Sequence, residues 1–448
     1  MKSESDPLSS SEFEFSSNES FLTEESCCLS PSLDDLPDEL LMKILSYIHP
    51  LSKTFAQLRG TSKRLYDVLQ TSSLYKTSSI DLSGNRPFDF DTLLSTTSRS
   101  AKSVTELNLS HSDDVTDYVI FQLAKVCNGL RALDVSYCQL LTNCGLRVLA
   151  NIVRLFKVDI SGCPNITSRG VYLFVKLSGD SLEELSMNFC LGLRNDPHRL
   201  PDMSIHGCKL KRLEMVWEKS LVAINPLRSV DLDRLTEHLR TLQYLDISQS
   251  RCGDADIEAI VMNCSLLLTL KLRNCSLHDR GLKHIGRWLP ILQHLDIADN
   301  HDITDRGLEF IACGCDQYLE HVDVSRCFDI HGPGLNILAS ACHSLHTVIA
   351  RECFDMTSNT ITYISLHCTN VRHLDVSFNL CVTDGTLSSI AHDHRRPDEE
   401  LEVVTEGCPH VLGHRFRGSV ESCDRRRFRF VDWEAKGNDE FVIWETNV

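Results

Sequence analysis

The sequence predicts an α/β solenoid, in which parallel strands line an inner face and helices cover the outer face. The prediction rests first on twelve copies of one motif, which recur every 25 to 28 residues with a single step of 32. In each copy, a short stretch of alternating apolar residues is followed by apolar residues at helical spacing. Units of this length stack so that each one contacts only its neighbours.

The stretch from Leu292 to Cys315 shows the motif most clearly. It matches the pattern L-x-x-L-x-L-x-x-N/C, which is typical of leucine-rich repeats and ends here at Asn300. We call the residue after the second leucine the aligned position. The aligned positions are Asp81, Asn108, Asp134, Asp159, Ser186, Glu214, Asp246, Lys271, Asp296, Asp323, Ile349 and Asp375.

Each copy is predicted to fold as a strand, a polar corner and a helix. Around Asp296, alternation directs Leu295 and Ile297 inward, and directs Asp296 and Ala298 outward, as in a half-buried strand. A threonine then precedes the helical stretch and can cap its first turn. A strand, a helix and a return make parallel neighbours, and hence a leucine-rich-repeat horseshoe. The capping threonines are Thr116, Thr142, Thr167, Thr304, Thr357 and Thr383.

The chain is expected to divide into four parts. Residues 1–32 are rich in serine and acidic residues, so this arm is predicted to be disordered. Residues 33–78 form a small helical module, residues 79–392 hold the repeats, and residues 393–448 form a linker and a capping hairpin. The helical module, with about 40 residues, is too small to be comfortably stable alone, so its apolar surface implies a docking site.

Composition excludes several classes of function. The net charge of −17 argues against binding to nucleic acid or to a membrane surface. No stretch of 18 apolar residues and no charged-then-apolar leader is visible, so we expect the protein in the cytoplasm, the nucleus or both. The sequence contains no phosphate loop, nucleophile elbow or paired-histidine metal motif, so no catalytic residue and no cofactor is predicted.

The cysteines follow the repeat rather than one another. A buried corner that accepts a small side chain explains this periodicity better than a disulfide or zinc framework does. Structural thiols in a reducing compartment are therefore predicted, and no metal site. Cys138, Cys163, Cys190, Cys275, Cys327 and Cys353 lie four residues after an aligned position, and Cys127, Cys264, Cys342 and Cys368 lie seven before one.

The inner face is predicted to be acidic, because eight of the twelve aligned positions carry a carboxylate. Neighbouring strands would hold these groups about 4.8 Å apart. Their repulsion would be offset either by N–H groups of each residue's own corner or by a basic target segment that crosses the strands. In the second case, changing Lys271 and Arg273 to glutamate should weaken target capture without lowering the melting temperature. The predicted target-binding residues are Asp246, Lys271, Arg273, Asp296, Asp323, Arg351, Asp375 and Trp217.

Between Asp196 and Thr241 the repeat is irregular. The steps lengthen to 28 and 32 residues, three prolines appear, and Trp217 lies three residues beyond the aligned Glu214. Both a longer connector and a binding loop are compatible with this pattern.

Three segments resemble an F-box. Leu36-Pro37-x-Glu39-Leu40-Leu41-x-x-Ile44-Leu45-Ser46-Tyr47-Ile48 is similar to its opening, Ser62 to Leu65 to its central helix start, and Ser73 to Lys76 to its close. Ser62, Leu65 and Tyr75 depart from the cysteine, aromatic residue and tryptophan that are commoner there. Since the repeats resemble the cysteine-containing leucine-rich subclass, residues 33 to 392 together resemble the F-box and leucine-rich repeat family.

The resemblance implies a non-catalytic substrate receptor of a Skp-cullin-F-box ubiquitin ligase. The module would bind a Skp-type adaptor, the adaptor would bind the cullin, and the repeats would hold a target protein close to the ubiquitin-loaded enzyme. A non-degradative leucine-rich-repeat scaffold, and an enzyme with an unfamiliar site, remain alternatives. The adaptor-binding residues implied are Leu36, Pro37, Leu40, Leu41, Ile44, Leu45 and Ile48.

The end of the sequence allows two interpretations. Residues 427–431 and 440–444 have strand-like composition around a plausible turn, which favours a hairpin that caps the last repeat. The final residues Glu445, Thr446 and Val448 also resemble the carboxyl-terminal ligands of PDZ domains, so a PDZ-domain protein is a second candidate partner.

Overall fold

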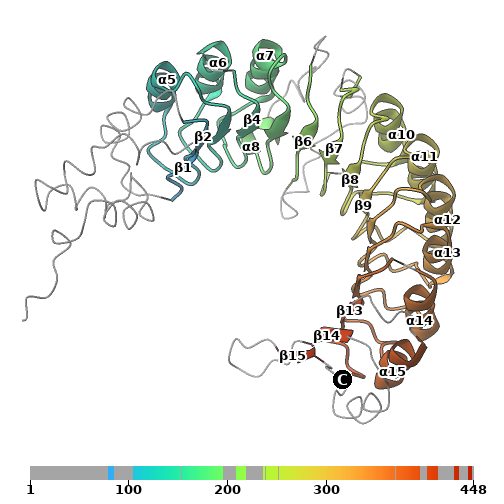
Figure 1. Cartoon of the computed structure of the whole chain (residues 1–448). Helices are drawn as coiled ribbons and strands as arrows, with labels where there is room; N and C mark the ends of the chain where they lie inside the picture. The colour runs from blue at the N-terminus through green and yellow to red at the C-terminus, as the bar shows by residue number, and fades with distance from the viewer. Residues whose placement is uncertain are drawn as a thin grey trace, which may run out of the picture.

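The computed structural model of the chain describes residues 79–84, 104–152, 154–194, 208–217, 236–237, 239–250, 252–368, 370–393, 401–411, 428–432 and 442–445. These residues form a stack of repeats that curves into an arc, with strands along the inside and helices on the outside (Figure 1). The predicted solenoid is therefore confirmed. The predicted disordered arm and the F-box-like module lie outside the described residues.

The strands form one sheet in which they follow chain order from β1 to β15. Pairing is parallel from β1 to β14, and each aligned position lies opposite the next one. The last pair, β14 and β15, is antiparallel. The strands are β1 (Ser79–Asp81), β2 (Glu106–Asn108), β3 (Ala132–Asp134), β4 (Lys157–Asp159), β5 (Glu184–Ser186), β6 (Arg212–Glu214), β7 (Tyr244–Asp246), β8 (Thr269–Lys271), β9 (His294–Asp296), β10 (His321–Asp323), β11 (Thr347–Ile349), β12 (His373–Asp375), β13 (Leu401–Val404), β14 (Phe428–Asp432) and β15 (Val442–Glu445).

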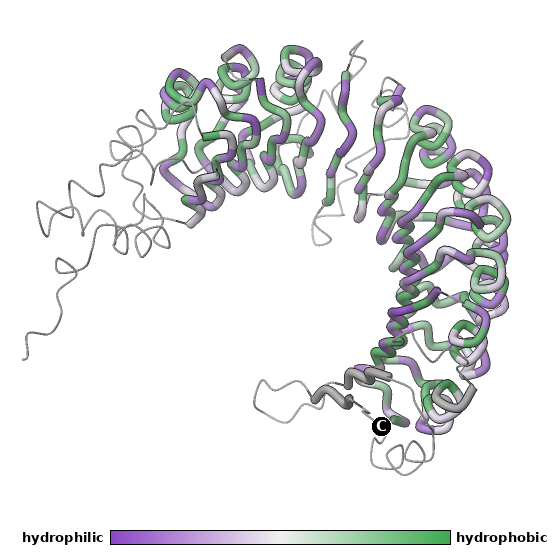
Figure 2. The backbone as a smooth tube through the Cα atoms, viewed as in Figure 1, coloured by the Kyte–Doolittle hydropathy of each residue, from purple (hydrophilic) through white to green (hydrophobic). Residues whose placement is uncertain are grey.

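A helix returns the chain between most neighbouring strands, as the helical spacing predicts. The described helices are α5 (Asp117–Val126), α6 (Asn143–Ile152), α7 (Ser168–Ser178), α8 (Leu191–Arg194), α10 (Asp254–Asn263), α11 (Asp279–Trp288), α12 (Asp305–Gly314), α13 (Pro333–Ala341), α14 (Ser358–His367) and α15 (Asp384–Asp393). Apolar and polar residues are mixed within every repeat rather than segregated along the arc (Figure 2). Each repeat therefore supplies its own slice of one continuous core.

The predicted alternation along the strands holds. Leu295 and Ile297 are fully buried, and Asp296 between them is half-buried on the inner face. Ala298, which was predicted to point outward, lies at the same offset as Arg273 and Arg351, whose side chains contact inner-face carboxylates, and its short side chain is fully buried there.

Helix capping by threonine is confirmed at some repeats and wrong at others. Thr116 accepts a hydrogen bond from the backbone N–H of Val119, and Thr304 accepts one from Arg306. Thr167 and Thr357 make no side-chain cap bond. The hydroxyl of Thr167 instead accepts a bond from the side chain of the preceding repeat's Asn143, so a contact between repeats replaces the local cap.

The corner after each strand repeats one unusual backbone conformation. Three residues beyond the aligned position, φ is positive in repeat after repeat, with values between 52° and 61° at residues other than glycine. Such a conformation costs a non-glycine residue about 1 kcal/mol or more. Here it turns the chain toward its helix while the same residue's N–H still bonds the next repeat, as from Asp299 to the carbonyl of Ser325 at 2.8 Å. The residues are His111, Tyr137, Phe189, Gln249, Asn274, Asp299, Arg326, Glu352 and Phe378, with Gly84, Gly162 and Gly407 at the equivalent positions.

The next residue fills the predicted buried corner. In most repeats it is a cysteine whose thiol donates to a carbonyl of the preceding repeat, as Cys327 does to Ile297 at 3.3 Å. Asn300 takes the same slot one repeat earlier and donates to Leu272 at 2.8 Å. The described cysteines at this slot are buried, as predicted, and burial raises the pKa of the Cys353 thiol to about 12, which keeps it protonated as a donor.

Irregular spacing does not interrupt the stack. β6 pairs with both β5 and β7 in the common register, and Glu214 lies opposite Asp246. The extra residues of this region, 195–207 and 218–235, fall outside the described residues. At the other end, β13 continues the parallel register before β14 and β15 complete the sheet.

Candidate functional site

The inner face of the arc is built from three columns of side chains. They come from the first residue of each strand, from the aligned position, and from the residue two positions after it. Because strand pairing is in register, equivalent residues stack from repeat to repeat along the sheet. This concave surface is the candidate site for binding a target protein.

Most of the aligned carboxylates bond their own corners, which confirms one of the two predicted ways of offsetting their repulsion. Asp134 accepts a hydrogen bond from the N–H of Ser136 at 2.9 Å, and Asp323 accepts one from Ser325 at 2.9 Å. Asn108 makes the same bond in β2, so the geometry does not require a charge. The same bond is made by Asp81, Asp159, Asp246, Asp296 and Asp375.

Arginines supply the remaining compensation in the second half of the arc. Arg273, two residues after the aligned Lys271, reaches Asp323 at 2.6 Å, Asp296 at 3.4 Å and Asp299 at 3.9 Å. These carboxylates belong to the two following repeats. Arg273 is thus a counter-ion that holds three repeats together.

Arg351, two residues after the aligned Ile349, likewise joins three repeats. It lies 3.5 Å from Asp375 and 3.0 Å from Glu406, which belong to the next two repeats. Arg326 lies between them and pairs with Asp299 at 2.7 Å and Glu352 at 3.5 Å. The charges of Arg273, Arg326 and Arg351 on this half of the arc are therefore already matched within the chain.

Lys271, Arg273 and Arg351, which were predicted to set a target's register, have partners within the chain. Both arginines are committed to neighbouring carboxylates. Burial disfavours the charge of Lys271, but Tyr244, Asp246 and Asp296 favour it more strongly, so the pKa of Lys271 is raised. Asp246, Asp323 and Asp375 are buried. A direct role for these residues in target binding stays a prediction.

Arg273→Glu is now expected to destabilise the fold, unlike the stability-neutral exchange expected from the sequence. It would remove ion pairs to three carboxylates and place a fourth negative charge beside them, at a cost of about 2 to 3 kcal/mol in the free energy of unfolding. Urea unfolding of the full chain would measure this, with Arg273→Lys as a milder, charge-conserving control. An unchanged urea midpoint for Arg273→Glu would show that these ion pairs do not stabilise the fold, and Arg273 would then be free to contact a target.

Trp217 is not available on the inner face as predicted. Its side chain is only 6% exposed, because it packs into the core, and the backbone N–H of Trp217 donates to the carbonyl of Ser248 in the β7 repeat. The large ring fills the corner region where other repeats carry smaller or half-exposed residues. It serves packing in this structure.

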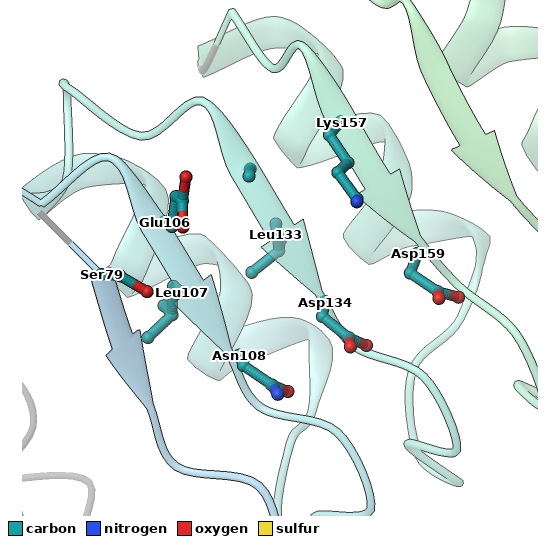
Figure 3. Close-up of a pocket in the computed structure, with 9 residues that line it drawn as sticks. Ser79, Glu106, Leu107, Asn108, Leu133, Asp134, Lys157 and Asp159 are labelled. Carbon is teal, nitrogen blue, oxygen red and sulfur yellow. The ribbon is translucent and has the colours of Figure 1, made fainter. Parts of the chain in front are cut away.

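The first half of the arc contains a hollow of about 290 Å³ on the inner face. Four neighbouring strands, β1 to β4, line it, and their side chains project over the sheet (Figure 3). Its rim carries Glu106, Asp134 and Asp159, and Lys157 lies beside them. Ala132, the first residue of β3, carries only a methyl group and so leaves space at the bottom of the hollow.

Charge in this hollow is less well matched than in the second half. Lys157 pairs with Glu184 at 3.3 Å, and no ion pair to Asp134 or Asp159 occurs within the described ranges. Burial, together with Asp134 and Glu214, raises the pKa of Asp159 above its ordinary value. A cation that entered the hollow would relieve that repulsion.

Sequence reasoning missed a column of histidines at the first strand position. His294 and His321 lie with ring centroids 5.7 Å apart, and His373 bonds Glu402 at 2.9 Å. Burial and the neighbouring His294 lower the pKa of His321, although Asp323 opposes the shift. The sequence signal for this column is histidine at one offset, two residues before three of the aligned positions.

Of the three residues in the predicted PDZ ligand, the structure describes only Glu445. Glu445 belongs to β15 and lies opposite Arg429 in the register of β14, whereas Thr446 and Val448 lie outside the described residues. The adaptor-binding residues from Leu36 to Ile48 also lie outside them. Both assignments stay predictions.

No helix in the described part of the chain combines the length and apolar character needed to cross a membrane. Within the same residues, no group of three or more histidine, cysteine or acidic side chains could hold a metal ion.

Comparison with known proteins identifies two kinds of module. An F-box-like family model matches residues 33–81, and a leucine-rich repeat model matches residues 290–312 and 367–391. Antagonist of mitotic exit network protein 1 of Saccharomyces cerevisiae is 27% identical over 121 residues, which are 26% of this chain and 22% of that protein. The match thus spans about a fifth of the relative's length.

A solved structure shares the fold. A chain in the crystal structure of the Rad7 and Elc1 complex in yeast superposes with a TM-score of 0.54 at 16% identity, and the match covers 84% of this chain and 90% of that one. At this identity the likeness concerns the fold alone.

Proposed function

This chain carries an F-box-like domain followed by leucine-rich repeats, and we propose on that basis that it is the substrate-recognition subunit of a Skp-cullin-F-box ubiquitin ligase. The order of the two modules is the observation that carries the proposal. The F-box-like domain would recruit the ligase through a Skp-type adaptor, and the repeats would hold the target. Such a receptor needs no catalytic group, because it acts by raising the local concentration of target lysines.

The concave surface supports a binding role for the repeats. A receptor must present a large, rigid face to a protein target, and the in-register sheet from β1 to β13 provides one. The incompletely matched carboxylates around the β1 to β4 hollow favour a basic side chain of the target at that end. In the second half of the face, ion pairs within the chain leave less charge for a partner.

Co-purification tests the proposal directly. Full-length tagged chain, expressed in cells, is expected to recover both a Skp-type adaptor and a cullin, and inhibition of the proteasome should raise the amount of any degraded target that it captures. Recovery of the adaptor without a cullin would favour the non-degradative scaffold. Recovery of neither would contradict the ligase assignment.

A further inference from the structure

Four successive repeats share an apolar row on the edge of the arc where the strands end. We call this the ring row, and it consists of the residues five positions after the aligned ones, which are His301, Phe328, Phe354 and Leu380. The rings of His301 and Phe328 stack with centroids 4.6 Å apart and planes 4° from parallel. Phe328 and Phe354 stack at 5.7 Å and 13°.

The left-handed corners explain why these side chains line up. In each of the four repeats, the residue two positions before the ring row has a φ between 52° and 60°. The intervening residue is then buried in the corner slot, so the following side chain is turned out of the core. In-register pairing of β9 to β12 repeats this geometry and places the side chains one above another.

The row remains open at its far end. Phe354 is 45% exposed and Leu380 is 54% exposed. Earlier repeats have no such continuous row, because Asp113, Gln139, Pro164 and Ser276 occupy the same offset. Three stacked rings followed by an exposed leucine, in four consecutive repeats, are unusual on a surface that binds nothing, because covering exposed apolar area lowers the free energy.

A second row follows immediately and is acidic. Asp302, Asp329 and Asp355 are the next residues after the first three members of the ring row, and all three are exposed. His278 approaches Asp302 at 3.8 Å. No lysine or arginine ion pair to this acid row occurs among the residues that the structure describes. A strip of rings is thus flanked by a strip of incompletely matched carboxylates.

We propose that the ring row and the acid row together form a docking surface for a segment that presents aromatic or aliphatic side chains flanked by lysine or arginine. Apolar side chains of the segment would cover the rings, and its cations would lie against the carboxylates. The assignment of this segment to the ligase target rests on the proposed function, whereas its chemistry follows from the surface alone. A second copy of this chain is a poor occupant, because each copy carries a net charge of −17.

The docking surface also differs from the concave face in how far its acidic side chains are paired within the chain. On the concave face, arginines two residues after the aligned positions already satisfy neighbouring acids. Arg326, two residues before Phe328 of the ring row, is held between Asp299 and Glu352. On this edge, a binding partner would therefore have to cover the apolar side chains and supply cations for the carboxylates.

Peptide selection tests the proposal without knowledge of the target. A phage-displayed library of random 12-residue peptides, selected on the immobilised full-length chain, is expected to yield sequences with apolar residues flanked by lysine or arginine. Labelled selected peptides should then lose at least about 10-fold in affinity to the double variant Phe354→Ser with Leu380→Ser, by fluorescence polarisation. Charge reversal by Asp302→Lys, Asp329→Lys and Asp355→Lys should cause a loss of similar size.

Matched controls separate docking from folding. Leu140→Ser with Leu191→Ser removes two exposed leucines, 52% and 41% exposed, from earlier repeats and should leave peptide affinity unchanged. Since all the substituted ring-row and acid-row residues are exposed, melting temperatures should match that of the wild type. A peptide with its basic residues changed to glutamate should bind the charge-reversed variant better than it binds the wild type.

Either of two results would overturn the docking proposal: selected peptides that bind the edge variants as tightly as the wild type, or enrichment of acidic sequences. The outcome is independent of the ligase assignment. Adaptor and cullin co-purification should be the same for wild type and edge variants, so loss of the proposed function would be seen separately from loss of docking.

Discussion

Alanine at Leu36, Pro37 and Ile44 together is expected to abolish co-purification of the chain with a Skp-type adaptor. Truncation of a docked aliphatic side chain costs about 2 to 5 kcal/mol, and losses at two such positions exceed what a modest interface can tolerate. Loss of Pro37 also removes a residue that would favour the start of the helix predicted from the sequence. Quantitative immunoblotting of the adaptor in tagged pull-downs would measure the effect.

The repeats should be unaffected by this triple change, because their core is formed by residues from Leu82 to Cys408. A matched double variant, Asp38→Ala with Lys43→Ala, alters polar positions of the same segment and should retain adaptor binding. The melting temperature of the full chain should be the same for all three proteins. Adaptor recovery by the triple variant at the wild-type level would remove the F-box assignment, whatever the repeats bind.

Asn300→Ala is expected to be among the most destabilising single changes in the repeats. The Asn300 side chain is 3% exposed, donates to the carbonyls of Leu272 and Ile297 at 2.8 Å each, and accepts from the N–H of Cys275 at 2.9 Å. Each buried backbone group left without a partner costs about 1 to 3 kcal/mol. A loss of about 3 to 5 kcal/mol in the free energy of unfolding follows.

The chain itself suggests the control for this prediction. Cysteine occupies the same corner slot in neighbouring repeats, and the Cys275 and Cys327 thiols donate to strand carbonyls of the preceding repeat at 3.4 Å and 3.3 Å. Asn300→Cys should therefore recover part of the lost stability. Urea unfolding would resolve the order wild type, Asn300→Cys, Asn300→Ala. Equal losses for the two variants would show that a thiol donor at this slot contributes no stability in place of Asn300.

Much of the architecture was determined by the sequence alone. The spacing of leucines between Leu292 and Leu308 specified both the strand and the helix, because a period of two and a period near four are properties of a short stretch of chain. The regular positions of Cys138 and Cys327 likewise predicted buried corners. The carboxylates bonded to their own corners were one of the two arrangements predicted.

Contacts between repeats were decided only by the tertiary structure. Arg273 lies 50 residues from Asp323 in the sequence, and no local pattern indicates that their side chains meet at 2.6 Å. The burial of Trp217 and the stacking of Phe328 on Phe354 depend in the same way on side-chain directions set by neighbouring repeats.

The corners show the physical reason for this division. A local rule disfavours positive φ at residues such as Arg326 and Phe378, so the sequence offered no reason to expect it there. The conformation persists because the N–H of each corner residue bonds a carbonyl of the next repeat, which outweighs the local cost. Periodicity within about ten residues therefore specified the elements, whereas backbone bonds from one repeat to the next, such as that from Asn274 to Ala298, determined how their side chains face one another and what surface they present.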